Sequence, residues 1–194
     1  MGAATLTKAG GVNKEHWVIW FVAKWWYEHE KGELTLTRLN KLLFILNREF
    51  KAKFGKPLLD LEFFMYFYGP YSVDLEDILN DSADRGLIDY VVEVKIPHAP
   101  RDLDEDYAYA IIKHQLDEVD APGKYVRKIV RPKAGAVEIP QDLEKLLKEI
   151  GITESELKEM IGGWIEEATS AGNIEDYTIE KYKLHGREFG ERLE

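Results

Sequence analysis

Histidines and carboxylates are the side chains of this sequence best suited to metal binding or acid–base catalysis, but their spacing does not favour either. Five histidines are scattered along the chain, at positions 16, 29, 98, 114 and 185, and none forms a His-x-His or His-Glu-x-x-His zinc pattern. Glu28, His29 and Glu30 are adjacent, yet neighbouring residues on a helix point about 100° apart. These three side chains therefore cannot converge on one ion.

Nucleophilic and phosphate-binding motifs are also missing from the sequence. Cysteine is absent, which excludes disulfides, thiolate metal sites and cysteine nucleophiles. There is no Gly-x-Gly-x-x-Gly, no Walker loop and no Gly-x-Ser-x-Gly. Carboxylates are so numerous that a close pair would be uninformative. We expect no cofactor, no metal and no enzymatic activity, and keep a hydrolase or nuclease built on clustered acids as a remote hypothesis.

One basic segment has the composition of a nucleic-acid contact. Its cationic residues are Lys124, Arg127, Lys128, Arg131 and Lys133. The interleaved Tyr125 could stack on a base. The net charge of −10, however, repels a phosphate backbone at long range. We therefore favour a solvated basic face that offsets the acidic residues 117–120, and keep DNA binding as the alternative.

Helical periodicity dominates the first third of the chain. Aromatic residues recur at helical spacing between positions 17 and 25 and predict a helix over residues 14–30. We expect its tryptophans in the core rather than in a ligand cage, because a central helix is apolar on most sides. A second helix is predicted over residues 38–54, with Thr37 as its N-cap and Gly55 at its end.

A third helix is predicted after a short extended stretch at residues 62–68. Gly69-Pro70 predicts a sharp break, and Ser72 is the expected N-cap of the helix, which ends near Arg85-Gly86. Acidic residues in its first turn suit the positive end of the helix dipole.

Strands are predicted in the middle of the chain and helices at its end. Alternation predicts a strand over residues 87–96, a loop over 97–106 and a returning strand over 107–116. Residues 124–133 fit a helix period but contain β-branched residues, so both assignments stay open. The tail predicts a helix over residues 141–150 and another that starts at the capping box Thr153-x-x-Glu156 and runs to about Ser170.

This order of elements is that of a winged helix-turn-helix. We predict an α+β, mostly helical fold, with a winged-helix-like domain over residues 1–135, a β-hairpin wing, and a helical extension over residues 136–194 packed on it; the alternative is one continuous domain. In such folds the third helix and the wing usually meet DNA. Here both are acidic: Asp74, Glu76, Asp77, Asp81 and Asp84 in the helix, and Asp102, Asp104, Glu105 and Asp106 in the wing.

Residues 36–88 resemble the Panacea-domain (SocA-like) antitoxins and the related YwgA-like proteins. The resemblance rests on the run Leu39-Asn40-Lys41-Leu42-Leu43, on Phe67-Tyr68-Gly69-Pro70-Tyr71-Ser72 and on Gly86-Leu87-Ile88. It implies a compact module that binds protein partners. The positions that match the motif, and hence the implied partner site, are Lys41, Tyr68, Gly69, Pro70 and Tyr71. Ser72 favours the YwgA-like branch.

The leading hypothesis is a non-enzymatic regulatory or adaptor module that binds another protein or a second copy of itself. We expect it in the cytoplasm, since no stretch has the roughly 20 apolar residues of a membrane helix. The charged fraction of 32% is a bias typical of thermophile proteins. The Tyr-Gly-Pro corner has two interpretations, a seal between strand and helix or a docking spot for a partner.

Overall fold

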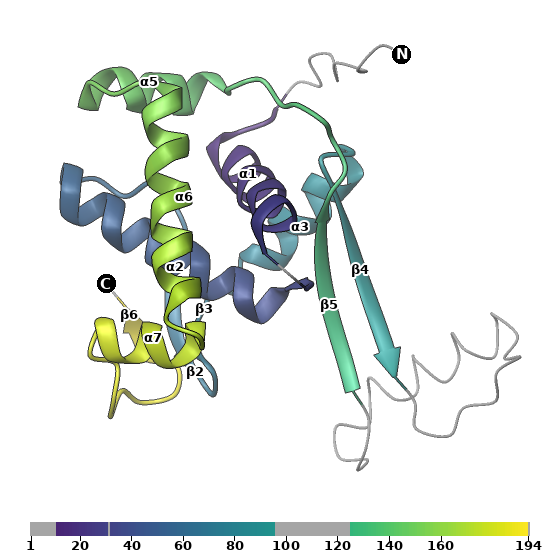
Figure 1. The fold of residues 1–194 in the computed structure, drawn as a ribbon, viewed down its shortest axis with the longest axis vertical. Helices are drawn as coiled ribbons and strands as arrows, with labels where there is room; N and C mark the ends of the chain where they lie inside the picture. The colour runs from purple at the N-terminus through teal and green to yellow at the C-terminus, as the bar shows by residue number, and fades with distance from the viewer. Residues whose placement is uncertain (1–10, 31, 96–124, 194) are drawn as a thin grey trace, which may run out of the picture.

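The computed structural model describes residues 11–30, 32–95 and 125–193 of the chain. Its elements are α1 (Lys14–His29), β1 (Leu34–Thr35), α2 (Leu36–Phe54), β2 (Phe63–Tyr66), β3 (Gly69–Tyr71), α3 (Leu75–Asp84), β4 (Ile88–Lys95), β5 (Tyr125–Pro132), α5 (Gln141–Ile150), α6 (Glu154–Ser170), α7 (Ile174–Lys181) and β6 (Arg192–Leu193). The fold is α+β with small antiparallel sheets, as predicted (Figure 1).

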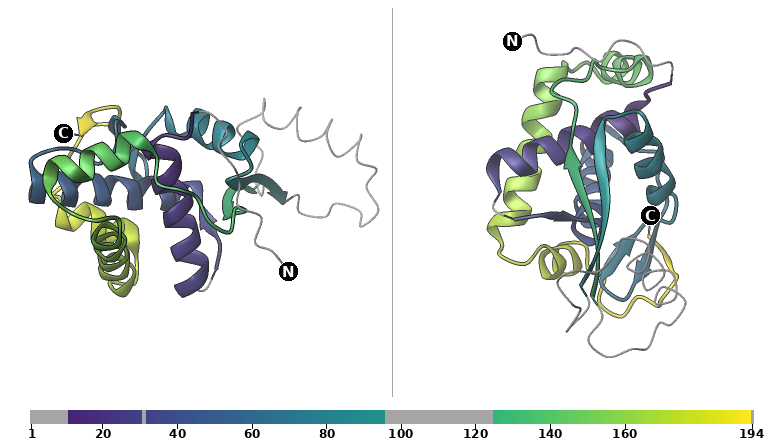
Figure 2. Two further views of the ribbon diagram at one scale, coloured as in Figure 1. Left: turned by 90° about the horizontal axis from the view of Figure 1, so that it is seen from above. Right: turned by 90° about the vertical axis from the view of Figure 1, so that its right-hand side faces the viewer.

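Helix α1 lies at the centre of the molecule, between α6 on one side and the β4–β5 ribbon on the other (Figures 1 and 2). Its N-terminus is fixed by a capping box between Asn13 and His16. Trp17 is fully buried, and Trp20 and Trp26 are 3% exposed. The prediction that the tryptophans build the core is confirmed for these three.

Helix α2 begins two residues earlier than predicted. Thr35, rather than Thr37, is the N-cap: its backbone is extended and its hydroxyl accepts a hydrogen bond from the Arg38 N–H at 3.3 Å. Gly55 closes the helix in the left-handed conformation with φ of 74°, as predicted. A stripe of apolar side chains is fully buried along the helix: Leu39, Leu42, Leu43, Leu46 and Phe50.

The longer sheet has the order β1-β5-β4, all antiparallel. Residues 124–133, for which both a helix and a strand were considered, contain the strand β5. This strand pairs with β4 from Ile88↔Pro132 to Lys95↔Tyr125. Its β-branched residues suit a pleated surface better than a helix. The predicted returning strand at 107–116 and the predicted loop at 97–106 lie outside the described residues.

The second sheet has the order β3-β2-β6. The prediction of a sharp break at Gly69-Pro70 is wrong. These two residues lie in β3, where Pro70 pairs with Met65 and Gly69 with Tyr66. The turn itself is formed by Phe67 and Tyr68. Proline is accepted here because β3 is an edge strand of this sheet.

Helix α3 corrects a second prediction, that Ser72 is its N-cap. The helix starts at Leu75, with Asp74 at the cap position and no side-chain cap hydrogen bond. Ser72 is fully buried, and its backbone N–H donates to Asn40 Oδ1 at 2.8 Å. The residue therefore anchors the segment before α3 to α2 instead of capping the helix.

The C-terminal helices share one hydrophobic core with the first part of the chain. Leu143, Leu157, Ile161 and Ile165 join the same buried cluster as Trp17. The predicted capping box of α6 is confirmed, with reciprocal hydrogen bonds between Thr153 and Glu156. The division at residue 135 stays a prediction. Of the helices that the structure describes, none combines the length and apolar character needed to cross a bilayer.

Candidate functional site

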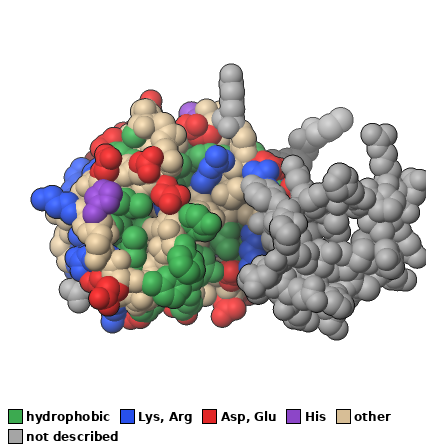
Figure 3. Space-filling view, turned by 90° about the horizontal axis from the view of Figure 1, so that it is seen from below, with side chains coloured by type: hydrophobic (Ala, Val, Ile, Leu, Met, Phe, Trp, Pro, Cys, Tyr) green, Lys and Arg blue, Asp and Glu red, His purple; other side chains and the backbone are tan. Residues whose placement is uncertain are grey.

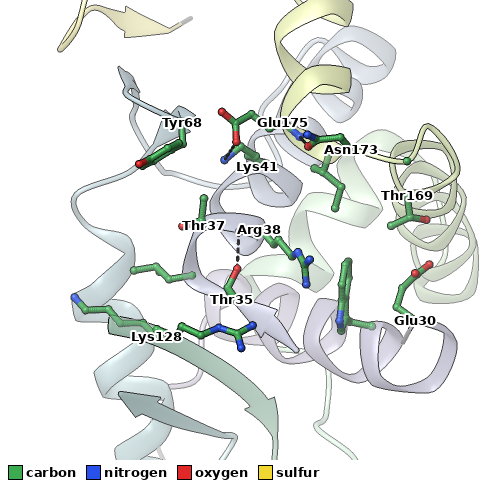
Figure 4. A pocket seen from close by; sticks show the side chains of 15 residues that line it. Glu30, Thr35, Thr37, Arg38, Lys41, Tyr68, Lys128, Thr169, Asn173 and Glu175 are labelled. Atoms are coloured by element: carbon green, nitrogen blue, oxygen red, sulfur yellow. Dashed lines mark hydrogen bonds and ion pairs between the residues drawn. The ribbon is translucent and has the colours of Figure 1, made fainter. Parts of the chain in front are cut away.

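A pocket of about 950 Å³ lies where α1, α2, the β2–β3 turn, β5 and the α6–α7 connection meet (Figure 4). Its wall combines charged and polar side chains with a few apolar ones. The polar residues of its α2 and α7 sides are Thr35, Thr37, Arg38, Lys41, Asn173 and Glu175. Lys41 and Tyr68, two of the predicted partner-binding residues, both line it.

Lys41 is a buried cation in the pocket wall. It sits on α2 within the apolar run from Leu39 to Leu46 and is only 3% exposed. Its amino group lies 3.9 Å from Glu175 Oε2, beyond hydrogen-bond distance (Figure 4). Burial lowers the pKa of Lys41 to about 8, although Glu175 acts in the opposite direction.

Two helix N-termini border the same pocket. Thr35 caps α2, and Asn173 caps α7 by accepting a hydrogen bond from the Glu175 N–H at 2.9 Å. Arg38 donates to the Glu33 carbonyl at 2.9 Å and lies over the Trp26 ring at 5.7 Å. The positive ends of both helix dipoles and the cationic side chains make this wall favourable for anions.

The Tyr-Gly-Pro motif lies beside Lys41. Tyr68 is 66% exposed at the turn, whereas Gly69 and Pro70 are buried. Gly69 has φ of +101°, and a Cβ added there would lie 3.5 Å from Lys41 Cε. Glycine therefore satisfies the backbone of the hairpin and leaves room for the lysine stem.

Tyr71 belongs to a different cluster, centred on Glu76. The Glu76 carboxylate accepts hydrogen bonds from Tyr71 at 2.8 Å, Tyr90 at 3.2 Å and Lys128 at 2.5 Å. Burial works to raise the pKa of Glu76, but these hydrogen bonds outweigh it and hold the pKa below its ordinary value. The cluster joins β3, α3, β4 and β5, which suits the interpretation of Tyr71 as a seal.

Exposed aromatic side chains gather at the tip of the β2–β3 hairpin. Phe67 is 81% exposed, Phe189 58% and Tyr66 37%. The Phe189 ring lies 4.7 Å from both the Phe67 and Tyr66 rings, and Tyr66 lies 4.9 Å from Tyr71. Figure 3 shows hydrophobic side chains gathered on this lower side of the molecule. We call Tyr66, Phe67, Tyr68 and Phe189 the aromatic tip.

Sequence reasoning missed most of this surface. Phe67 directly precedes the Tyr-Gly-Pro motif, and this position next to the motif was the one sequence feature that could have marked Phe67 as part of the site. Phe189 and the pocket residues Asn173 and Glu175 come from the tail and have no motif of their own. The pairing of β2 with β6 and the packing of α7 on α2 and β3 bring the tail to the hairpin and the pocket.

The basic segment is compensated by carboxylates on neighbouring elements. Lys124 lies outside the described residues. The other four predicted cations all have a partner: Arg127 with Glu33 at 3.4 Å, Lys128 with Glu76 at 2.5 Å, Arg131 with Glu33 at 2.7 Å, and Lys133 with Asp89 at 3.2 Å. The cationic side chains that would contact phosphates are thus already in ion pairs with carboxylates of the same chain. The arrangement gives the DNA-binding alternative no support.

Metal-binding groups are not assembled in the part of the chain that the structure describes. No group of three or more histidine and carboxylate side chains there could hold an ion. His29, from the Glu28-His29-Glu30 run, instead stacks on Trp25 with ring centroids 4.4 Å apart.

One family model matches part of the chain. The model of the antitoxin SocA-like Panacea domain covers residues 39–120, which includes most of α2, the β2–β3 hairpin, α3 and β4. The resemblance predicted from residues 36–88 is therefore confirmed for the Panacea family, and the YwgA-like branch stays a prediction. No curated protein and no solved structure matches the chain significantly.

Proposed function

We propose that this chain, whose residues 39–120 match the Panacea domain of SocA-like antitoxins, is a non-enzymatic regulatory module that binds a protein partner. The family supports an antitoxin-like role. The antitoxin-like family suggests a protein partner for the domain, and residues 39–95 of the match include the β2–β3 hairpin.

The observation that carries the proposal is the aromatic tip. The aromatic rings of Phe67 and Phe189 are 81% and 58% exposed. A cluster of exposed apolar side chains is unfavourable in water and usually marks a binding surface. Aromatic residues are enriched in protein interfaces and supply much of their binding energy. The partner therefore docks on the tip of the hairpin, with Tyr68 extending the contact toward the pocket.

The winged-helix assignment belongs to this proposal too. It is supported by the order α1, β1, α2, α3, β4, β5, with the hairpin β2–β3 inserted between α2 and α3, and by the sheet order β1-β5-β4. In this proposal the module has a winged-helix fold, but it binds its partner through the β2–β3 hairpin and not through the acidic helix α3. Residues 136–194 add α7 and Phe189 to that surface.

The proposed location is the cytoplasm. It is supported by the antitoxin-like family and by the lack of a membrane-crossing helix among those described. Absence of cysteine fits a reducing compartment.

Co-expression with each protein encoded beside this chain, followed by light scattering, tests the proposal. We expect one neighbour to form a complex of defined mass and to lose its toxicity to the host. Phe67→Ser should weaken that complex by about tenfold or more. Val92→Ser removes an apolar side chain that is 46% exposed on β4 and is the matched control. A strictly monomeric chain with no bound neighbour would contradict the proposal.

A further inference from the structure

We infer that the pocket beside Lys41 is a binding site for a small anionic ligand that carries a carboxylate or phosphate group. This site shares Tyr68 with the aromatic tip but is formed mainly by α2 and α7, and it does not depend on the partner proposed above. Four observations support it: the state of the Lys41 amino group, the donors around it, the place of Glu175, and the size of the space.

The amino group of Lys41 has unused hydrogen-bonding capacity. An ammonium group has three donors and no acceptor. Within the described residues it donates no hydrogen bond, and Glu175 supplies the one carboxylate within 4.0 Å. The residue is 3% exposed as a whole, but its nitrogen opens into the pocket instead of being sealed in the core, so its donors face the pocket. An anion in the pocket would supply the missing acceptors.

The surrounding wall adds further donors. The Asn173 side-chain oxygen accepts from its own helix, which leaves its NH₂ group free to donate. Arg38 uses one of its nitrogens on the Glu33 carbonyl and keeps other N–H groups. The N-termini of α2 and α7 add the positive ends of their dipoles. An oxyanion held by Lys41 would thus be surrounded mainly by donors.

Glu175 occupies the place that the ligand would take. Its side chain is 33% exposed and its contact with Lys41 is long, so it can turn outward at small cost. In Figure 4 it lies next to the Lys41 amino group, with Tyr68 to one side and Asn173 to the other. The Glu175 carboxylate thus takes the place of the ligand's anionic group beside Lys41 and would compete with the ligand for the amino group.

The size of the space favours a small molecule over a single side chain of a partner. The volume of about 950 Å³ falls within the range of roughly 300–1,000 Å³ typical of ligand pockets. Trp26, Leu36 and Ile174 add apolar wall on which the uncharged part of a ligand can pack.

Calorimetric titration of the full chain at pH 7 with inorganic phosphate and with citrate tests the inference. We expect at least one of the two anions to bind. Tighter binding of phosphate would indicate a phosphate ligand, and tighter binding of citrate would indicate a carboxylate ligand. Lys41→Met keeps most of the side-chain volume and should weaken binding by about tenfold or more. Sodium chloride at matched ionic strength controls for screening, and circular dichroism checks that the variant folds.

Two further variants separate a ligand site from a general charge effect. Glu175→Gln removes the competitor and should tighten anion binding about threefold or more. Glu30→Gln removes one negative charge from the same pocket at its far side, as Figure 4 shows, and should change the affinity less. The inference is overturned if neither anion binds, if Lys41→Met binds as tightly as the wild type, or if Glu175→Gln does not bind more tightly.

Discussion

The amino group of Lys41 lies 3.9 Å from the carboxylate of Glu175, so α2 and α7 face each other through an ion pair without a hydrogen bond, in which Lys41 is buried and Glu175 is 33% exposed. A tightly paired lysine would keep a high pKa. Here burial dominates and lowers the pKa from the ordinary 10.5 to about 8. The fold thus tolerates an unfavourable charge at the position where the family motif places a lysine.

This relationship predicts a particular dependence of stability on pH. Because the pKa of Lys41 is lower in the folded state, the unfolded chain takes up the proton first as the pH falls. The contribution of Lys41 is therefore most favourable above pH 10.5, is lost as the pH falls toward 8, and is constant below that. Relative to Lys41→Met, the free energy of unfolding should change by at most about 1.4 kcal/mol per pH unit in this window.

Urea unfolding of the two proteins at pH 7, 8, 9 and 10 measures this difference. Other groups titrate in the same range, but they are common to both proteins and cancel in the comparison. Parallel stability curves across the whole range would show that Lys41 is not desolvated as described.

Two adjacent glycines in α6 give a prediction about packing. A Cβ on Gly162 would come within 2.8 Å of Trp25 Nε1, whereas a Cβ on Gly163 meets nothing within 4 Å. Gly162→Ala should therefore lower the stability by about 1–3 kcal/mol through overpacking. Gly163→Ala should raise it by about 0.5–1 kcal/mol, because alanine favours a helix more than glycine does.

Thermal unfolding of the two variants gives the answer directly. The midpoint temperature should fall for Gly162→Ala and rise for Gly163→Ala. A stabilised Gly162→Ala protein would mean that α1 and α6 are further apart than the structure has them.

The compensated basic strand β5 predicts weak interaction with nucleic acid. Arg127, Lys128, Arg131 and Lys133 are each within 4.0 Å of a carboxylate, so phosphate contacts would first have to break these pairs. We expect no binding of a random DNA duplex at about 50 mM salt in fluorescence anisotropy, where phosphate contacts are strongest. Binding that weakens steeply with added salt would restore the DNA-binding alternative.

The sequence predicts the local structure well where one signal acts alone. The capping box at Thr153 and the glycine at position 55 each mark a helix end that the structure confirms. Errors arise where two signals compete. Ser72 is a good N-cap type, yet its backbone N–H bonds to Asn40 from another element, and the helix starts later.

The site was predictable only in part, because tertiary contacts assemble it. Lys41 and Tyr68 are in the motif, and both line the pocket. Glu175 and Phe189 come from the tail, and no local pattern says that the tail packs against the hairpin. Gly69-Pro70 suggests a break, but an edge strand accepts both residues, so the exposed turn moves to Phe67 and Tyr68.

Site-specific photo-crosslinking in the source cells tests the central claim most directly. A photoreactive phenylalanine analogue placed at Phe67 should capture one defined protein, because this 81% exposed ring lies at the proposed docking surface. The same analogue at Val92, which is 46% exposed on β4, should capture none. Equal capture at both positions, or none at Phe67, would contradict a partner surface at the tip of the hairpin.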